Sequence, residues 1–200
     1  MKKLIFAISL FSVVLFSACA GVPQVEIDAA NAAVKDAKTA GADLYVPADY
    51  KAVVDSLASA TIKVETAKSS WFKTYSDAKY ALAFVTKMAV DVKVKSEARK
   101  VEVKTETDAL ITDVKALIID DKALLAKAPK GKDGKAALQA ISTELSVVET
   151  TVTESEALLA TDLFTANSKM ITAKDKATAI KTELETATDK TALTKAINKK

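Results

Sequence analysis

Few side chains in this chain of 200 residues are of a type that carries out chemistry. It contains one cysteine, Cys19, and no histidine. Without an imidazole there is no general base for a Ser-His-Asp or Cys-His arrangement, and the usual nitrogen ligands of zinc and haem are missing. A single cysteine also excludes an intrachain disulfide and a cysteine-rich metal cage. We therefore expect no catalytic residues, no cofactor and no metal site.

Two clusters of charged residues deserve a separate test. Asp120 and Asp121 are neighbours in a predicted helix, so their side chains point in different directions and cannot share a proton or a metal ion. The second cluster is a lysine-rich turn around Asp133, made of Lys127, Lys130, Lys132 and Lys135. It lacks the preceding strand and the Lys-Ser or Lys-Thr pair of a phosphate-binding loop. We interpret it as a solvated turn, with contact to anionic polymer or lipid headgroups as the alternative.

The position of Cys19 is more informative than its chemistry alone. Two lysines follow Met1, an apolar run extends from Leu4 to Phe16, and small residues lead to Cys19. This order is typical of an export signal, and the run is shorter than the roughly 20 residues of a helix that spans a bilayer. We therefore predict a signal peptide over residues 1–18 rather than a permanent transmembrane helix.

The segment Phe16-Ser17-Ala18-Cys19 resembles the lipobox of bacterial lipoproteins, although Phe16 stands where that family most often has leucine. The resemblance implies that the Cys19 thiol is diacylated, that the signal is removed before it, and that the new amino terminus receives a further chain such as palmitate. Two or three acyl chains anchor a protein stably. The alternative is an ordinary signal-peptidase site at Ala18-Cys19-Ala20, which would release the chain without its cysteine.

The charge pattern argues against a nucleic-acid partner. The formal net charge is +3, and loss of Lys2 and Lys3 with the signal leaves the mature chain near neutral. Arg99 is the only arginine, and lysines and acids alternate as on a solvated helix face. Ala20 and Gly21 after the cysteine lack the aspartate of an inner-membrane retention signal. By resemblance to lipoproteins, we expect an outer-membrane anchor with the protein facing the periplasm.

Glycine and proline divide the mature chain into a few long elements. They cluster at residues 21–23, 41–47 and 129–134. Gly41 suits the end of one helix, and Pro47 suits the first turn of the next. We predict a lipidated tether over residues 19–23 and a helical domain over 24–200, with helices over about 24–40, 47–128 and 135–198.

Heptad repeats predict how these helices pack. One row recurs every seven residues from Tyr50 through Trp71 to Val92, and after an eleven-residue step it resumes at Val103. The third helix has a similar row from Leu138 to Ala187. We predict an all-α fold, an elongated antiparallel helical hairpin or coiled-coil rod with a short N-terminal helix. The alternative is a folded-back three- or four-helix bundle that bends within residues 96–107.

Residues 28–85 resemble an alanine-rich helical domain of unknown function that recurs in bacterial outer-membrane lipoproteins. Its alanine-periodic helix, its G-A-x-x-Y-x-P turn and its second helix are represented by Ala33, Ala37, Ala40, Gly41, Ala42, Tyr45, Pro47, Tyr50, Ala52, Leu57 and Ala60. The resemblance implies helices and an envelope location. It implies no activity.

Aromatic residues concentrate between Tyr45 and Phe84. Phe72, Tyr80 and Phe84 form a second apolar stripe beside the heptad row. We expect the first helix, or the end of the third, to cover this stripe in a local three-helix core. The alternative is a surface for self-association or for an envelope partner.

These features predict a non-catalytic, lipid-anchored envelope protein that acts as a helical scaffold or spacer at the outer membrane. The alternative is a binding module, either a surface-displayed adhesin or a peptidoglycan tether. The tether is suggested by Lys200, because the murein lipoprotein of enteric bacteria looks similar in its lipobox, its heptad helix and its terminal lysine. Its length and its topology do not match this chain.

Overall fold

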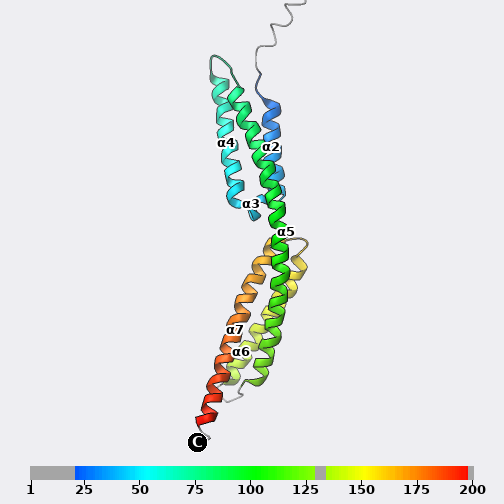
Figure 1. Ribbon diagram of the computed structural model, residues 1–200, viewed down its shortest axis with the longest axis vertical. Coiled ribbons are helices and arrows are strands. Elements are labelled where there is room, and N and C mark those ends of the chain that lie inside the picture. The colour runs from blue at the N-terminus through cyan, green and yellow to red at the C-terminus, as the bar shows by residue number, and fades with distance from the viewer. Residues whose placement is uncertain (1–20, 129–133, 198–200) are drawn as a thin grey trace, which may run out of the picture. The chain divides into compact units, whose positions relative to one another are not determined.

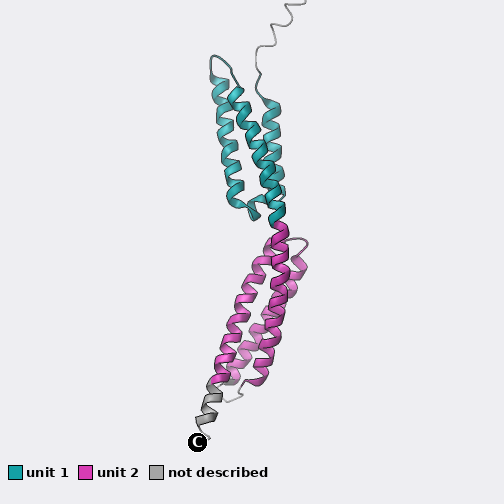
Figure 2. Cartoon of the chain, in the orientation of Figure 1, with its two compact units in different colours: residues 1–99 teal, residues 100–200 magenta. Residues whose placement is uncertain are grey.

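The computed structural model describes residues 21–128 and 134–197, and within these ranges it contains helices and no strands. The helices are α2 (Gln24–Thr39), α3 (Ala42–Tyr45), α4 (Pro47–Ser69), α5 (Ser76–Lys127), α6 (Gly134–Leu158) and α7 (Leu163–Ile197) (Figure 1). The predicted all-α class is confirmed. The chain divides after Arg99 into two compact units, unit 1 up to Arg99 and unit 2 from Lys100, and α5 contributes to both (Figure 2).

Helix α5 continues without a break through residues 96–107. No glycine or proline occurs in this stretch, so nothing in the backbone favours a bend. The chain therefore does not fold back within this stretch, as the bundle alternative supposed. Two of the turns between helices, at residues 70–75 and 159–162, contain no glycine or proline.

Unit 1 is a three-helix arrangement of α2, α4 and the first part of α5. Near the starts of α2 and α5, Lys79 Nζ lies 3.0 Å from Glu26 Oε1. Near the start of α4, Asp49 Oδ2 lies 2.9 Å from Lys95 Nζ, about five turns into α5. Helix α2 therefore runs parallel to α5, and α4 runs antiparallel to both. The core is rich in alanine and valine: Ala30, Val34, Ala37, Ala42, Val53, Ala60, Val64, Tyr75, Ala78, Leu82, Val85, Ala89 and Val92.

The turn between α2 and α3 depends on Gly41. Its φ of 85° is left-handed, and a Cβ at this position would lie 2.9 Å from a ring carbon of Tyr45. Glycine alone adopts this conformation without strain and leaves room for the ring. The Oγ of buried Ser96 on α5 donates a hydrogen bond of 2.9 Å to the Ala40 carbonyl, which holds the turn against the unit. The predicted helix end at Gly41 is confirmed.

The prediction of one helix over 47–128 is wrong, because residues 70–75 form a turn between α4 and α5. The Oγ atoms of Ser69 and Ser70 both donate to the Thr66 carbonyl, at 3.0 and 3.1 Å, and Ser70 has an extended backbone. The two hydroxyls satisfy a carbonyl at the end of the helix, so no glycine is needed to end it. Trp71, which we assigned to the seam, lies in the turn and is 94% exposed.

Unit 2 is a second three-helix arrangement, formed by the rest of α5 with α6 and α7. Asp113 and Asp120 on α5 pair with Lys174 and Lys181 on α7, seven residues apart on both helices, so these two helices are parallel. Lys115 pairs with Glu156, and Lys122 pairs with Glu149 one heptad later on α5 and one heptad earlier on α6. Helix α6 is therefore antiparallel to α5.

The core of unit 2 contains larger aliphatic side chains than the core of unit 1. Its members are Ile111, Val114, Ile118, Ala128, Ile141, Leu145, Val148, Val152, Met170, Ala173, Ala177, Ile180 and Leu184. Most of them belong to the predicted heptad rows. Within each unit, the helices thus pack as a three-helix bundle and not as one long hairpin.

The predicted helix over 135–198 is also interrupted, at residues 159–162. Asp162 Oδ1 accepts a hydrogen bond of 3.1 Å from the backbone N–H of Thr165, so Asp162 caps the start of α7. Hydrogen bonds from the Thr165 side chain and backbone lower the pKa of Asp162. The cap favours a new helix start where the heptad row alone suggested continuity.

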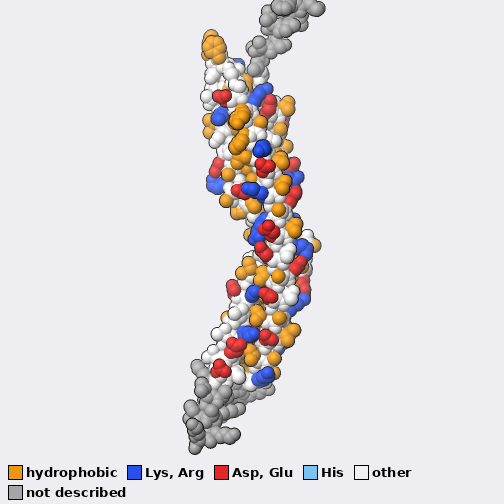
Figure 3. Space-filling model, viewed as in Figure 1, with side chains coloured by type: hydrophobic (Ala, Val, Ile, Leu, Met, Phe, Trp, Pro, Cys, Tyr) orange, Lys and Arg blue, Asp and Glu red, His pale blue; other side chains and the backbone are white. Residues whose placement is uncertain are grey.

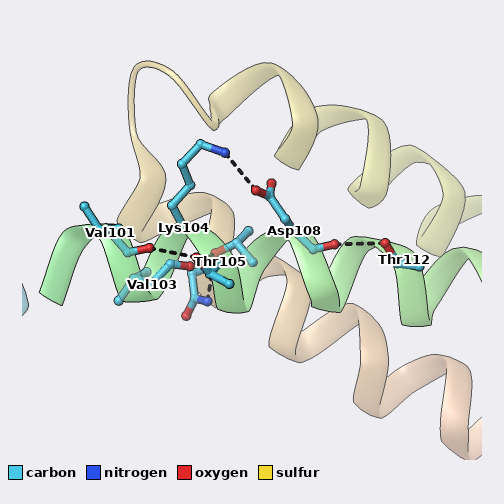
Figure 4. A network of polar contacts seen from close by, with 8 residues as sticks. Val101, Val103, Lys104, Thr105, Asp108 and Thr112 are labelled. Carbon is cyan, nitrogen blue, oxygen red and sulfur yellow. Dashed lines mark hydrogen bonds and ion pairs between the residues drawn. The ribbon is translucent and has the colours of Figure 1, made fainter. Parts of the chain in front are cut away.

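A buried polar contact follows the eleven-residue step in the heptad row. Thr107 Oγ1 donates to the Val103 carbonyl at 2.6 Å and accepts from Asn167 Nδ2 of α7 at 2.9 Å. Figure 4 shows this part of α5, where Lys104 also pairs with Asp108 at 2.7 Å. Because Thr107 is fully buried, its hydrogen bonds compensate for a polar group in the core.

Candidate functional site

The predicted aromatic stripe is uncovered in the structure. Phe72, Tyr80 and Phe84 are 82%, 77% and 53% exposed. The expectation that another helix covers them is wrong. Ala78, Leu82 and Val85 of α5 are buried in the core of unit 1, while Tyr80 and Phe84 lie on a different face of the helix. The structure therefore favours the alternative, a surface open to a partner.

The two most exposed aromatic residues lie together in the turn between α4 and α5. Trp71 and Phe72 are adjacent, and both project from unit 1 into solvent. Figure 3 shows hydrophobic side chains at the end of this helical hairpin and along its length. Tyr75 in the same turn is buried in the core, so the base of the turn is fixed while its tip is exposed. We call Trp71 and Phe72 the aromatic tip.

An open groove runs between α4 and α5 beside Tyr80 and Phe84. Its floor contains Ala60 and Val85, and its walls carry Asp55 and Lys63 as well as the two aromatic rings. Asp55 is paired with Lys51 on its own helix, Nζ to Oδ2 2.7 Å. The groove combines apolar and charged walls, and the hydroxyls of Ser56 and Ser59 in its lining donate to the Ala52 and Asp55 carbonyls of α4. Its two exposed rings make it a candidate binding surface.

The charges around the aromatic tip are balanced. The turn at residues 70–75 contains Lys73 and no acid. Lys68 lies 3.6 Å from Glu65, and Lys79 pairs with Glu26. The hydrogen bond from Lys79 lowers the pKa of Glu26, so this acid stays ionised and paired. The tip therefore presents apolar rings without unpaired acids in the turn itself.

One buried carboxylate stands out in unit 2. Asp121 is fully buried, and neither of its oxygens has a hydrogen-bond partner. Burial raises the pKa of Asp121 to about 6. The positive charge of Lys181 lowers this pKa, and the negative charges of Asp120 and Glu185 raise it. The exposed Asp120 pairs with Lys181 at 3.0 Å, so the two neighbouring carboxylates do point in different directions. Asp121 is buried out of reach of any substrate, so it affects the free energy of folding rather than binding.

Several predicted residues lie outside the described ranges. They are Cys19, Lys130, Lys132, Asp133 and Lys200. Their roles stay predictions. Lys127 and Lys135, which flank the lysine-rich turn, are exposed.

Metal ligation and membrane spanning can be assessed for residues 21–128 and 134–197. No three acidic, cysteine or histidine side chains there are grouped closely enough to hold a metal ion. None of the helices in this part of the chain has the length and apolar character needed to cross a membrane.

Comparison with known proteins gives no match to a protein family, to a curated protein or to a solved structure.

Sequence reasoning found the stripe but missed the turn in which Phe72 lies. The missing signal was the pair Ser69-Ser70, whose short polar side chains compete for backbone groups and favour helix ends. Val64 and Ala78, one heptad before and one heptad after Trp71, are both buried. The heptad row therefore has the same phase on both sides of the turn. A row that keeps its phase across a turn cannot reveal that turn.

Proposed function

We propose that this protein is a non-catalytic, lipid-anchored scaffold or spacer of the bacterial envelope, held at the outer membrane and facing the periplasm. The observation that carries the proposal is the position of Cys19. The only cysteine of the chain ends an apolar run that begins after two lysines, and it completes a lipobox-like segment. Acylation of this thiol would supply enough buried methylene groups for stable anchoring.

The rest of the chain supports a role without catalysis. It contains no histidine, and the serine hydroxyls that line the groove between α4 and α5 donate to backbone carbonyls of their own helix. Units built from parallel and antiparallel helices with paired charges at their surfaces are suited to holding a fixed length and presenting side chains.

The anchor is tested by fractionation of cells that express the full chain or its Cys19→Ser variant. We expect the full chain in the outer-membrane fraction and the variant in the soluble periplasmic fraction, because serine cannot be diacylated by this route. Ala18→Ser, which changes a neighbouring small residue and keeps the thiol, is the matched control and should stay in the membrane. Retention of Cys19→Ser in the membrane would contradict the anchor.

A second candidate is a binding module, and the exposure of Tyr80 and Phe84 along the groove favours it. An envelope protein or a second copy of the chain would cover these rings. A photo-cross-linking amino acid at Tyr80 should then give a discrete adduct in cells. The same amino acid at Val101, which is exposed on unit 2, is the control. Equal adducts at both positions would argue against a dedicated surface.

A further inference from the structure

The aromatic tip and the start of α2 lie at the same end of unit 1. The Lys79–Glu26 pair joins the first turn of α5 to the first turn of α2 at 3.0 Å. The tip immediately precedes α5, at residues 71 and 72, and Figure 1 shows the start of α2 beside the turn between α4 and α5. Val25 in the first turn of α2 is also 80% exposed. One end of unit 1 therefore carries several uncovered apolar side chains.

The proposed lipid anchor is close to this end in the sequence. Cys19 precedes Gln24, the first residue of α2, by five residues. Five extended residues span at most about 18 Å. An acylated Cys19 in the membrane would thus keep the aromatic end of unit 1 within a short distance of the lipid surface.

The chemistry of the tip fits a bilayer interface. Tryptophan and phenylalanine are large, and the indole combines an apolar body with one N–H donor, which favours the headgroup region. The turn that holds them contains a lysine and no acid, so no carboxylate of the turn would have to enter the interface. Full exposure of two adjacent rings to water is unfavourable unless a partner covers them.

We propose that Trp71 and Phe72 are a second membrane contact, which inserts into the interface of the same bilayer that carries the lipid on Cys19. The contact deepens the proposed function and rests on it. Two points of attachment, the acyl chains and the aromatic tip, fix the direction of unit 1 at the membrane, whereas a lipid on a short tether alone leaves it free to rotate.

Trp71 is the only tryptophan of the chain, so its own fluorescence reports the contact. The purified, processed protein is reconstituted into phosphatidylethanolamine and phosphatidylglycerol vesicles with or without lipids brominated near the headgroup. We expect a blue-shifted emission and at least about two-fold quenching by the bromines, since quenching requires contact with the interface. Phe72→Ser keeps the probe, removes half of the tip, and should reduce the quenching.

A relocated probe is the matched control. Trp71→Phe combined with Val94→Trp moves the indole to another exposed position of α5 in unit 1. Position 94 lies about 27 Å along the helix from its first residue, Ser76. We expect no quenching there. Equal quenching at positions 71 and 94, or none at 71, would overturn the membrane contact.

Flotation of the same vesicles separates this proposal from the anchor. Protein that floats with the vesicles while Trp71 is unquenched overturns the tip contact and leaves the anchor intact. Protein that does not float overturns both. A blue shift that depends on protein concentration in lipid-free Cys19→Ser protein would show that the tip binds a second copy, and would also overturn the proposal.

Discussion

Units 1 and 2 have the same helix directions but differ in what they bury and what they expose. Unit 1 has a core of mostly small residues and leaves Trp71, Phe72, Tyr80 and Phe84 exposed, although Tyr75 is buried. Unit 2 has a core of larger aliphatic residues and buries an unpaired carboxylate and a Thr107–Asn167 hydrogen bond. The two units therefore share one helix arrangement but differ in where their unusual side chains lie. In unit 1 the unusual groups are at the surface, where they can bind, and in unit 2 they are inside, where they affect stability.

The ion pairs between helices are also placed differently in the two units. Among the described residues, pairs join α5 to both partner helices of unit 2 and repeat with the heptad. In unit 1 the pairs between helices lie at the two ends, at Glu26–Lys79 and Asp49–Lys95. Between these ends, unit 1 carries the exposed rings of Tyr80 and Phe84 beside charged residues such as Asp55 and Lys63.

The largest expected effect comes from shortening a core leucine in each unit. Leu82 in unit 1 and Leu184 in unit 2 are buried. Leu82→Ala and Leu184→Ala should each lower the free energy of unfolding by about 2–5 kcal/mol, because each leaves a cavity. Hydrogen exchange followed by mass spectrometry should show faster exchange in α2 and α4 for the first variant, and in α6 and α7 for the second. Equal acceleration in both units would contradict their division.

The buried carboxylate predicts a pH dependence confined to unit 2. The pKa of Asp121 is raised from 3.8 to about 6, so between these values the folded state binds more protons than the unfolded state. Stability must then fall as the pH rises through this window. The full cost, reached near pH 7, is about 3 kcal/mol for a shift of this size.

Asp121→Asn tests this effect with a neutral side chain of the same shape. The variant should match the native protein near pH 4 and exceed its stability by up to about 3 kcal/mol near pH 7. Urea unfolding at a series of pH values measures the difference, and Asp120→Asn, at the exposed neighbour, is the control. A constant difference between native protein and Asp121→Asn across this range would contradict the raised pKa.

A smaller effect is expected at the turn between α2 and α3. Gly41→Ala places a Cβ against the Tyr45 ring and forces alanine into a left-handed conformation. The cost should be about 1–3 kcal/mol and should be confined to unit 1. Thermal unfolding followed by circular dichroism measures it. The conservative control is Gly21→Ala, since a Cβ on Gly21 meets nothing within 4 Å, and the two variants should not be equally stable.

The smallest effect is expected at a surface ion pair of unit 2. Lys174→Ala removes the partner of Asp113 across α5 and α7, at 2.7 Å. Both side chains are substantially exposed, so the loss should be below about 1 kcal/mol and should shrink further in high salt. Urea unfolding at low and high salt checks it. A loss comparable to that of Leu184→Ala would show that paired charges, and not the aliphatic core, hold unit 2 together.

Much of the fold could be predicted from the sequence. The glycine at 41 and the proline at 47 marked real helix boundaries, and the absence of both between residues 76 and 127 matched the uninterrupted α5. Heptad positions such as Val85, Val148 and Leu184 are buried as the period requires. These features depend on local helix propensity and on the seven-residue period, and both can be read from the sequence.

The turns at 70–75 and 159–162 could not be predicted in the same way. Serine hydroxyls at 69 and 70 and the Asp162 cap replace glycine and proline there, and each is also common on helix surfaces. Missing the first turn led us to place Trp71 in a seam. Which faces stay open depends on where the chain turns back, and this is a property of the tertiary structure. A single sequence contains even less information about which partner covers an exposed face.

The central claim is that lipid on Cys19 holds this protein at a membrane. The intact mass of the mature protein, purified from membranes, tests it most directly. We predict a chain that begins at Cys19 and carries the added mass of a diacylglyceryl group and a further acyl chain. An unmodified chain that begins at Gly21 would contradict the claim.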